Sequence, residues 1–192
     1  MIKLLMAVAM LIPSAKALDK IEVAYQWHKT AWDNELKYQI TTLLPDLETA
    51  RDIELWCPNY FTMDTVGRTD VWATIFVSIA YYESTYKPTS RHIEGSGVWS
   101  IGLFQLSTPD EMPWCRHTTE DDLTDPENNI KCAVPLFVRL VSADHVIADG
   151  TNGKSAIGAA KYWAVMRDGT YRGHHLQNIK DNVAKFCGVD YD

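Results

Sequence analysis

Apolar residues recur at helical spacing along the chain and predict a mainly helical fold. Trp72, Phe76 and Ile79 are separated by four and three residues, so they share one face of a helix predicted over 71–83. Either residue of the preceding Thr69-Asp70 pair can cap this helix, because its side-chain oxygen can accept from a backbone N–H of the first turn. We therefore expect a helix with a buried aromatic stripe here.

A second helix is predicted after Asp125, which suits an N-cap position and is followed by Pro126 in the first turn. Pro135 lies inside this stretch and should kink or interrupt the helix, because proline lacks a backbone N–H. The apolar residues at helical spacing in this stretch are Ile130, Val134, Phe137 and Val141.

Further helices are predicted over 18–49, 155–166 and 175–186. The stretch 86–100 contains a proline and two glycines, which is typical of a loop or a short hairpin. β structure should therefore be scarce. A chain of 192 residues without an internal repeat or linker suits one domain.

The start of the chain has the pattern of an export signal. Lys3 precedes an unbroken apolar run over 4–12, and an A-x-A-like cleavage site follows at 15–17. The run is too short to span a bilayer. We expect residues 1–17 to be removed and residues 18–192 to form one domain in the periplasm or outside the cell, without a membrane anchor. The alternative is an N-terminal helix that stays attached.

The cysteine count agrees with export, because an even number after a signal segment suggests disulfides. Four cysteines allow three pairings. We favour Cys115 with Cys132, which closes a loop, and Cys57 with Cys187, which ties down the C-terminal helix. Zinc is the rival interpretation, but no C-x-x-C pair occurs and His117 is isolated, so no metal site or cofactor is expected.

Charge restricts the partners. The chain carries a net charge of −7, and removing residues 1–17 takes away Lys3 and Lys16 but no acid, which leaves 16 basic and 25 acidic residues, or −9. Nucleic acid and anionic lipid surfaces are therefore poor partners. A monomer is the default expectation.

Glu83 is the first candidate for chemistry. It continues the apolar stripe at the C-terminal end of the helix over 71–83. Burial and the negative end of the helix dipole would both raise the pKa of its carboxyl group, as a general acid requires. The alternative is a helix-end glutamate that points into solvent.

Four short motifs follow one another in an order that is informative. They are Glu83-Ser84, Gly102-Leu103-Phe104-Gln105, Asn129-Ile130 and Ala160-Lys161-Tyr162-Trp163. Between about 69 and 165, the chain resembles the catalytic domain of soluble lytic transglycosylases, relatives of goose-type lysozyme. It departs from the family pattern where Phe104 replaces a methionine, Trp163 replaces an asparagine and Lys161 is inserted before Tyr162.

The resemblance implies a lysozyme-like, mainly α domain with a small hairpin or loop region, which cleaves the β-1,4 bond between N-acetylmuramic acid and glucosamine units of peptidoglycan. It makes Glu83 the single catalytic acid and gives Ser84 a substrate contact. Gln105 and the backbone at Gly102 would form the cleft floor, and Tyr162 would orient Glu83. Three purely structural alternatives remain: a helix-end hydroxyl for Ser84, a tight turn for Gly102 and a core aromatic for Tyr162.

One acid leaves two reactions open. Hydrolysis usually needs a second carboxylate, whereas a lytic transglycosylase uses the muramic acid hydroxyl and leaves an anhydro end. Candidates for the second acid, or for substrate binding, are Glu94, Asp110 and Glu111, and these acidic loops favour the lysozyme-like reaction. Together with Asp121 and Asp122 they also suit a cleft for deacetylated peptidoglycan, whose free amines can be protonated. The alternative is that these acids lie elsewhere and aid solubility.

Two other functions remain open. A chitinase- or chitosanase-like glycosidase would share the scaffold and the acid but would not need muramic acid. A degenerate glycan-binding module would keep the fold without cutting. A serine triad is not supported, because no G-x-S-x-G turn occurs.

Overall fold

The computed structural model describes residues 27, 31–107, 115, 119–150, 155–169 and 174–189. The proposed signal segment, Asp110, Glu111 and His117 lie outside these residues. The described part is mainly helical, as predicted. In these ranges, no helix is long and apolar enough to cross a membrane, and no three His, Cys, Asp or Glu side chains gather as a metal site would require.

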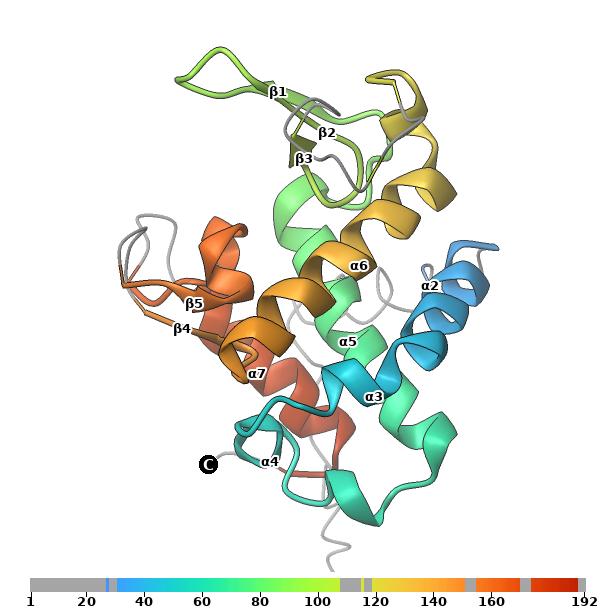
Figure 1. The fold of residues 1–192 in the computed structure, drawn as a ribbon, viewed down its shortest axis with the longest axis vertical. Coiled ribbons are helices and arrows are strands. Elements are labelled where there is room, and N and C mark those ends of the chain that lie inside the picture. The colour runs from blue at the N-terminus through green and yellow to red at the C-terminus, as the bar shows by residue number, and fades with distance from the viewer. Residues whose placement is uncertain are drawn as a thin grey trace, which may run out of the picture.

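Two long helices form the centre of the molecule, α5 (Thr65–Ser84) and α6 (Pro126–Asp144). Helix α2 (Ala31–Thr42) packs against both, and α7 (His175–Phe186) packs against α5. The small sheet lies beyond the end of α5 (Figure 1). The shorter helices are α3 (Leu44–Leu47), α4 (Ile53–Trp56), η1 (Tyr60–Thr62), η4 (Asp122–Thr124), η5 (Ala159–Lys161) and η6 (Ala164–Met166).

Helix α5 begins earlier than predicted. Its N-cap is Asp64, whose carboxylate accepts from the Gly67 N–H at 2.8 Å. The expected caps lie inside the helix and bind α2 instead: the Thr69 hydroxyl lies 3.2 Å from that of Thr41, and Asp70 pairs with Lys37 at 2.9 Å. The prediction of Thr69 or Asp70 as the cap was therefore wrong, because tertiary contacts use these two side chains.

The aromatic stripe of α5 is confirmed, because Trp72, Phe76 and Ile79 are fully buried. Helix α6 has the predicted cap, since the Asp125 carboxylate accepts from the Asn128 N–H at 2.9 Å. It runs through Pro135 without a break. The four apolar residues predicted on its inner face, Ile130, Val134, Phe137 and Val141, are all buried. Helix α7 has the predicted bounds.

The predicted helix over 155–166 is not formed. This stretch contains strand β5 (Ile157–Gly158), which pairs with β4 (Ala148–Asp149), followed by η5 and η6. Gly158 has a φ of 59°, and a Cβ there would overlap the carbonyl oxygens of Val146 and Ile147. The chain needs a glycine for this close approach, and a continuous helix cannot pass through such a residue.

The sheet beyond α5 has three antiparallel strands in the order β1-β2-β3: β1 (Arg91–Ile93), β2 (Trp99–Ile101) and β3 (Leu106–Ser107). Strands β1 and β2 form a hairpin, which agrees with the loop or short hairpin predicted over 86–100. In the register, Ser100 of β2 lies between His92 and Ser107. Because paired residues share a face, these three side chains lie on one side of the sheet.

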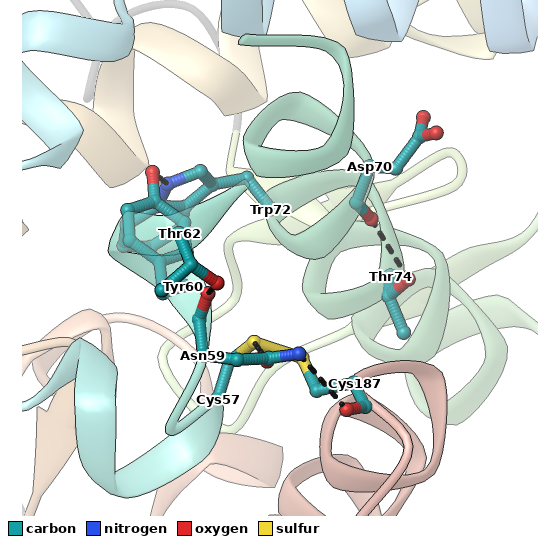
Figure 2. Close-up of a disulfide and its surroundings, with 8 residues drawn as sticks. All are labelled: Cys57, Asn59, Tyr60, Thr62, Asp70, Trp72, Thr74 and Cys187. Carbon is teal, nitrogen blue, oxygen red and sulfur yellow. Dashed lines mark hydrogen bonds between the residues drawn. A yellow bond between two sulfur atoms is a disulfide. The ribbon is translucent and has the colours of Figure 1, made fainter. Parts of the chain in front are cut away.

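Both favoured disulfide pairings are present, Cys57–Cys187 and Cys115–Cys132. The first joins the segment before α5 to the end of α7, and the Asn59 amide donates to the Cys187 carbonyl at 3.3 Å beside it (Figure 2). The same view contains the Trp72 indole, which donates to the Tyr60 hydroxyl at 2.8 Å. Two disulfides suggest an oxidising environment outside the cytoplasm.

The two disulfides should contribute unequally to stability. Cys57–Cys187 spans 130 residues and Cys115–Cys132 spans 17. Loop entropy then predicts that the double serine variant lowers the free energy of unfolding by about 5 kcal/mol for the first pair and about 3 kcal/mol for the second. Urea unfolding of the two variants measures both losses. A larger loss for the short loop would contradict the entropic explanation.

Candidate active site

Glu83 lies in the last turn of α5, one turn beyond the buried stripe, and is partly exposed. The helix ends in two consecutive residues with left-handed backbones, Thr85 (φ 53°) and Tyr86 (φ 59°). Such conformations cost about 1–3 kcal/mol each outside glycine and are concentrated at functional sites. Tyr86 is held by ring contacts at 5.5 Å to Trp27 and 5.6 Å to Tyr81, and burial raises the pKa of its hydroxyl.

Ser84 is buried, and its hydroxyl donates to the Ala80 carbonyl at 3.0 Å. This hydrogen bond matches the structural alternative for Ser84, a hydroxyl that binds backbone at the helix end. It keeps the last turn of α5 closed under Glu83. A substrate contact by Ser84 stays a prediction.

The predicted cleft floor is a tight turn over 102–105. Gly102 has a φ of 80°, and a Cβ there would overlap the Asn129 amide and the Leu123 carbonyl. Gln105 also has a left-handed backbone, with a φ of 47°, and its side-chain amide donates to the Gly102 carbonyl at 2.8 Å. A glycine at position 102 is therefore required both by its backbone and by its neighbours.

The Ser90 carbonyl joins this turn to the segment that follows α5. It accepts from the Gly102 N–H at 2.8 Å and from the Gln105 amide at 3.3 Å. Ser90 is seven positions after Glu83, so the chain that leaves α5 is bonded to the predicted floor. The motifs Glu83-Ser84 and 102–105 thus belong to one local unit.

Asn129 anchors the turn to α6 and is fully buried. Its amide nitrogen donates to the carbonyls of Ile101 at 3.0 Å and Leu123 at 2.9 Å. Its amide oxygen accepts from the Phe104 N–H at 2.9 Å. Both the oxygen and the nitrogen of the side-chain amide are therefore hydrogen-bonded. This explains in structural terms why an asparagine stands in the Asn129-Ile130 motif.

Trp163, at which the chain departs from the family pattern, binds the 102–105 turn. Its buried indole N–H donates to the Phe104 carbonyl at 2.9 Å, so side chains hold both backbone groups of Phe104. The inserted Lys161 pairs with Asp144 at 2.6 Å. Burial opposes ionisation of Asp144, but Lys161 and the Gly158 N–H outweigh it and lower the pKa of this carboxyl group.

Tyr162 binds the last strand of the sheet. Its hydroxyl accepts from the Ser107 N–H at 2.6 Å and lies 3.1 Å from the Ser107 hydroxyl, to which it donates. The ring is half-buried against Trp163 at 4.8 Å. Tyr162 is therefore fixed at the sheet, while the expected hydrogen bond to Glu83 stays a prediction.

Glu94 occupies the turn of the β1–β2 hairpin. Its backbone N–H donates to the Val98 carbonyl at 2.8 Å, and one carboxylate oxygen accepts from the Ser100 hydroxyl at 2.7 Å. Ser100 and Ser107 are neighbours across β2 and β3, so a polar row crosses the sheet between Glu94 and Tyr162. The sequence analysis did not identify either serine as a site residue. The alternation of polar Ser100 with apolar Ile101 is the pattern of a strand with one polar face, and it could have indicated Ser100.

The other acids proposed for the cleft have different partners. Asp121 pairs with Arg91 at 2.6 Å, and Glu120 lies 3.6 Å from the same guanidinium. Asp122 accepts from the Thr119 N–H at 2.7 Å, which lowers the pKa of its carboxyl group. These carboxylates therefore have partners in β1 and in the segment before α6.

One family model matches part of the chain. Residues 64–144 match the family model described as the transglycosylase SLT domain. This segment is therefore similar to a transglycosylase SLT domain. Such a domain indicates an enzyme that acts on peptidoglycan. Among curated proteins, none matches the chain.

Solved structures of one protein have a similar fold. Bd0314 DslA, in its wild-type form 2, is 28% identical with a TM-score of 0.71, over 82% of this chain and 92% of that one. A mutant of the same protein is 26% identical with a TM-score of 0.72, over 84% of this chain and 96% of that one. The fold is therefore similar to that of DslA, and the similarity extends beyond residues 64–144.

The SLT domain match begins at the cap of α5 and ends with α6. It contains Glu83, Glu94, the 102–105 turn and Asn129. Tyr162 and Trp163 lie beyond it. Trp163, which holds the 102–105 turn together with Asn129, therefore lies outside the matched segment.

Removing the Asn129 amide should loosen the turn. Asn129→Ala leaves the Phe104 N–H and two carbonyls without these partners, so the free energy of unfolding should fall by about 3 kcal/mol. Asn128→Ala is the matched control, because Asn128 is partly exposed, and it should change stability by less than about 0.5 kcal/mol. Urea unfolding of both variants tests this, and equal losses would contradict it.

Proposed function

We propose that this protein cleaves the β-1,4 bonds between N-acetylmuramic acid and glucosamine units in peptidoglycan strands, with Glu83 as the general acid. The observation that supports the proposal is the pair of hydrogen bonds that the Ser90 carbonyl accepts from Gly102 and Gln105. They join the segment after Glu83 to the 102–105 turn, which Asn129 and Trp163 hold from two other elements. A partly exposed acid beside a rigid backbone surface is what protonation of a bound glycosidic oxygen requires.

The reaction that we propose is hydrolysis with Glu94 as the second acid. The Glu83 proton passes to the leaving oxygen as the glycosidic bond breaks. A water oxygen bonds to the anomeric carbon and gives its proton to the Glu94 carboxylate, which leaves a reducing end. Without a second acid, the C6 hydroxyl of muramic acid would attack instead, its proton would return to Glu83, and a 1,6-anhydro end would form.

Two observations support Glu94 in this role. It lies in the β1–β2 hairpin, which follows α5 in the chain, and its carboxylate accepts a hydrogen bond from Ser100. Two of the DslA structures are glutamate-to-glutamine mutants at positions that are eleven residues apart, the same separation as between Glu83 and Glu94. Ser84, Gln105 and Tyr162 are proposed to position the sugar and Glu83.

The activity should depend on the Glu83 proton. Glu83→Gln keeps the shape of the side chain but cannot donate an acidic proton, so cleavage of sacculi should fall at least about a hundredfold. Release of soluble fragments measures the loss, and a thermal unfolding curve checks the fold. Glu54→Gln is the matched control, because Glu54 is an exposed acid on α4, away from the sheet.

The two competing functions give different results in the same assay. A glycan-binding module would release no fragments in either form. A chitosanase-like enzyme would cut chito-oligosaccharides as fast as sacculi. Equal cleavage by wild type and Glu83→Gln would remove the proposal altogether.

We also propose a preference for deacetylated peptidoglycan. A deacetylated glucosamine carries an amine that is protonated, and a carboxylate nearby would attract it. Asp121 is paired with Arg91, and Asp122 is bonded to Thr119, whereas the hydrogen bond that fixes Glu94 comes from a neutral hydroxyl. Glu94 is therefore the candidate for this attraction.

Native and deacetylated sacculi should be digested at different rates. Wild type should cut the deacetylated form about tenfold faster, which corresponds to about 1.4 kcal/mol, and Glu94→Gln should lose most of this difference. Mass spectrometry of the digests measures the rates and the type of end together. Equal rates of wild type on both substrates would end the idea of a preference.

A further inference from the structure

We propose that Ser100 is a positioning residue that acts through Glu94 and thereby decides between hydrolysis and anhydro-end formation. This inference rests on the proposed function, in which Glu94 accepts the proton of the attacking water. Neither the family match nor the predicted motifs include Ser100 as a functional residue. Its contacts in the sheet are what suggest the role.

Ser100 is the rigid partner of the pair. It lies in the middle of the central strand, paired with His92 on one side and Ser107 on the other, and is only 7% exposed. Glu94 is exposed and lies on a hairpin turn. The 2.7 Å hydrogen bond therefore joins an exposed carboxylate to the hydroxyl of a buried strand residue, which restricts the rotamers of Glu94.

A serine at this position has no advantage for the sheet itself. Strand interiors favour β-branched and aromatic residues, and Ser100 stands between Trp99 and Ile101. A buried hydroxyl also needs a hydrogen-bond partner, and here that partner is the Glu94 carboxylate. The residue is therefore explained by the carboxylate that it holds.

The hydrogen bond occupies Oε1 of Glu94 and leaves Oε2 to take the water proton. When the bond is absent, the carboxylate can leave its position, and water is activated less often. Glu83 still protonates the leaving oxygen. The C6 hydroxyl of muramic acid then attacks the anomeric carbon and returns its proton to Glu83, so the share of 1,6-anhydro ends should rise.

The experiment compares Ser100→Ala, Ser100→Thr and Glu94→Gln with wild type in digests of deacetylated sacculi. Ser100→Ala should lower kcat about tenfold, leave KM nearly unchanged and raise the share of anhydro ends. Ser100→Thr keeps the hydroxyl and should restore both values. Ser142→Ala is the matched control, because its hydroxyl donates only to the Asp46 carbonyl among the described contacts and lies on α6 away from the sheet.

A loss of packing alone would lower the rate without changing the type of end, so the product ratio separates positioning from structure. If Ser100→Ala has wild-type kcat and wild-type ends while Glu94→Gln changes them, the inference fails and the role of Glu94 stands. If Glu94→Gln itself changes nothing, the proposed hydrolysis fails first. Should Ser100→Ala not fold, Ser100→Cys keeps the volume with a weaker donor and must give the same shift in ends.

Discussion

The site depends on one buried amide, the side chain of Asn129. Its oxygen and nitrogen bind three backbone groups, at Phe104 in the turn, Ile101 in β2 and Leu123 in η4, and the side chain is fully buried. A buried polar network of this kind is stable only when every group is paired, so it permits a single arrangement of the loops. Helix α6 thus determines where the backbone over 102–105 lies.

Everything else in the candidate site is placed relative to that turn. Trp163 holds the Phe104 carbonyl from the far side, and the Ser90 carbonyl connects the turn to the end of α5. The family pattern is changed at Trp163, yet the altered residue supplies a hydrogen bond to the same turn. In this chain the turn is therefore held by Asn129 and Trp163 together.

The sequence predicted the parts of the fold that depend on local periodicity and failed where distant contacts decide. Helices α6 and α7 and the aromatic stripe were correct, because burial of one helix face leaves a repeating pattern. The start of α5 was wrong, since Thr69 and Asp70 bind α2, and the helix over 155–166 was wrong, since Gly158 approaches another backbone. Motif residues of the site were identified by resemblance, but Ser100 and Ser107 were missed because strand register gives them their roles.

The β1–β2 hairpin projects away from the helices (Figure 1). Its tip makes little use of the core, so insertions, deletions and exchanges there cost the fold little. The acid on that tip can therefore be gained or lost in evolution without redesign of the helical frame. Under the proposed function, a change confined to this hairpin would alter the reaction and leave the helices as they are.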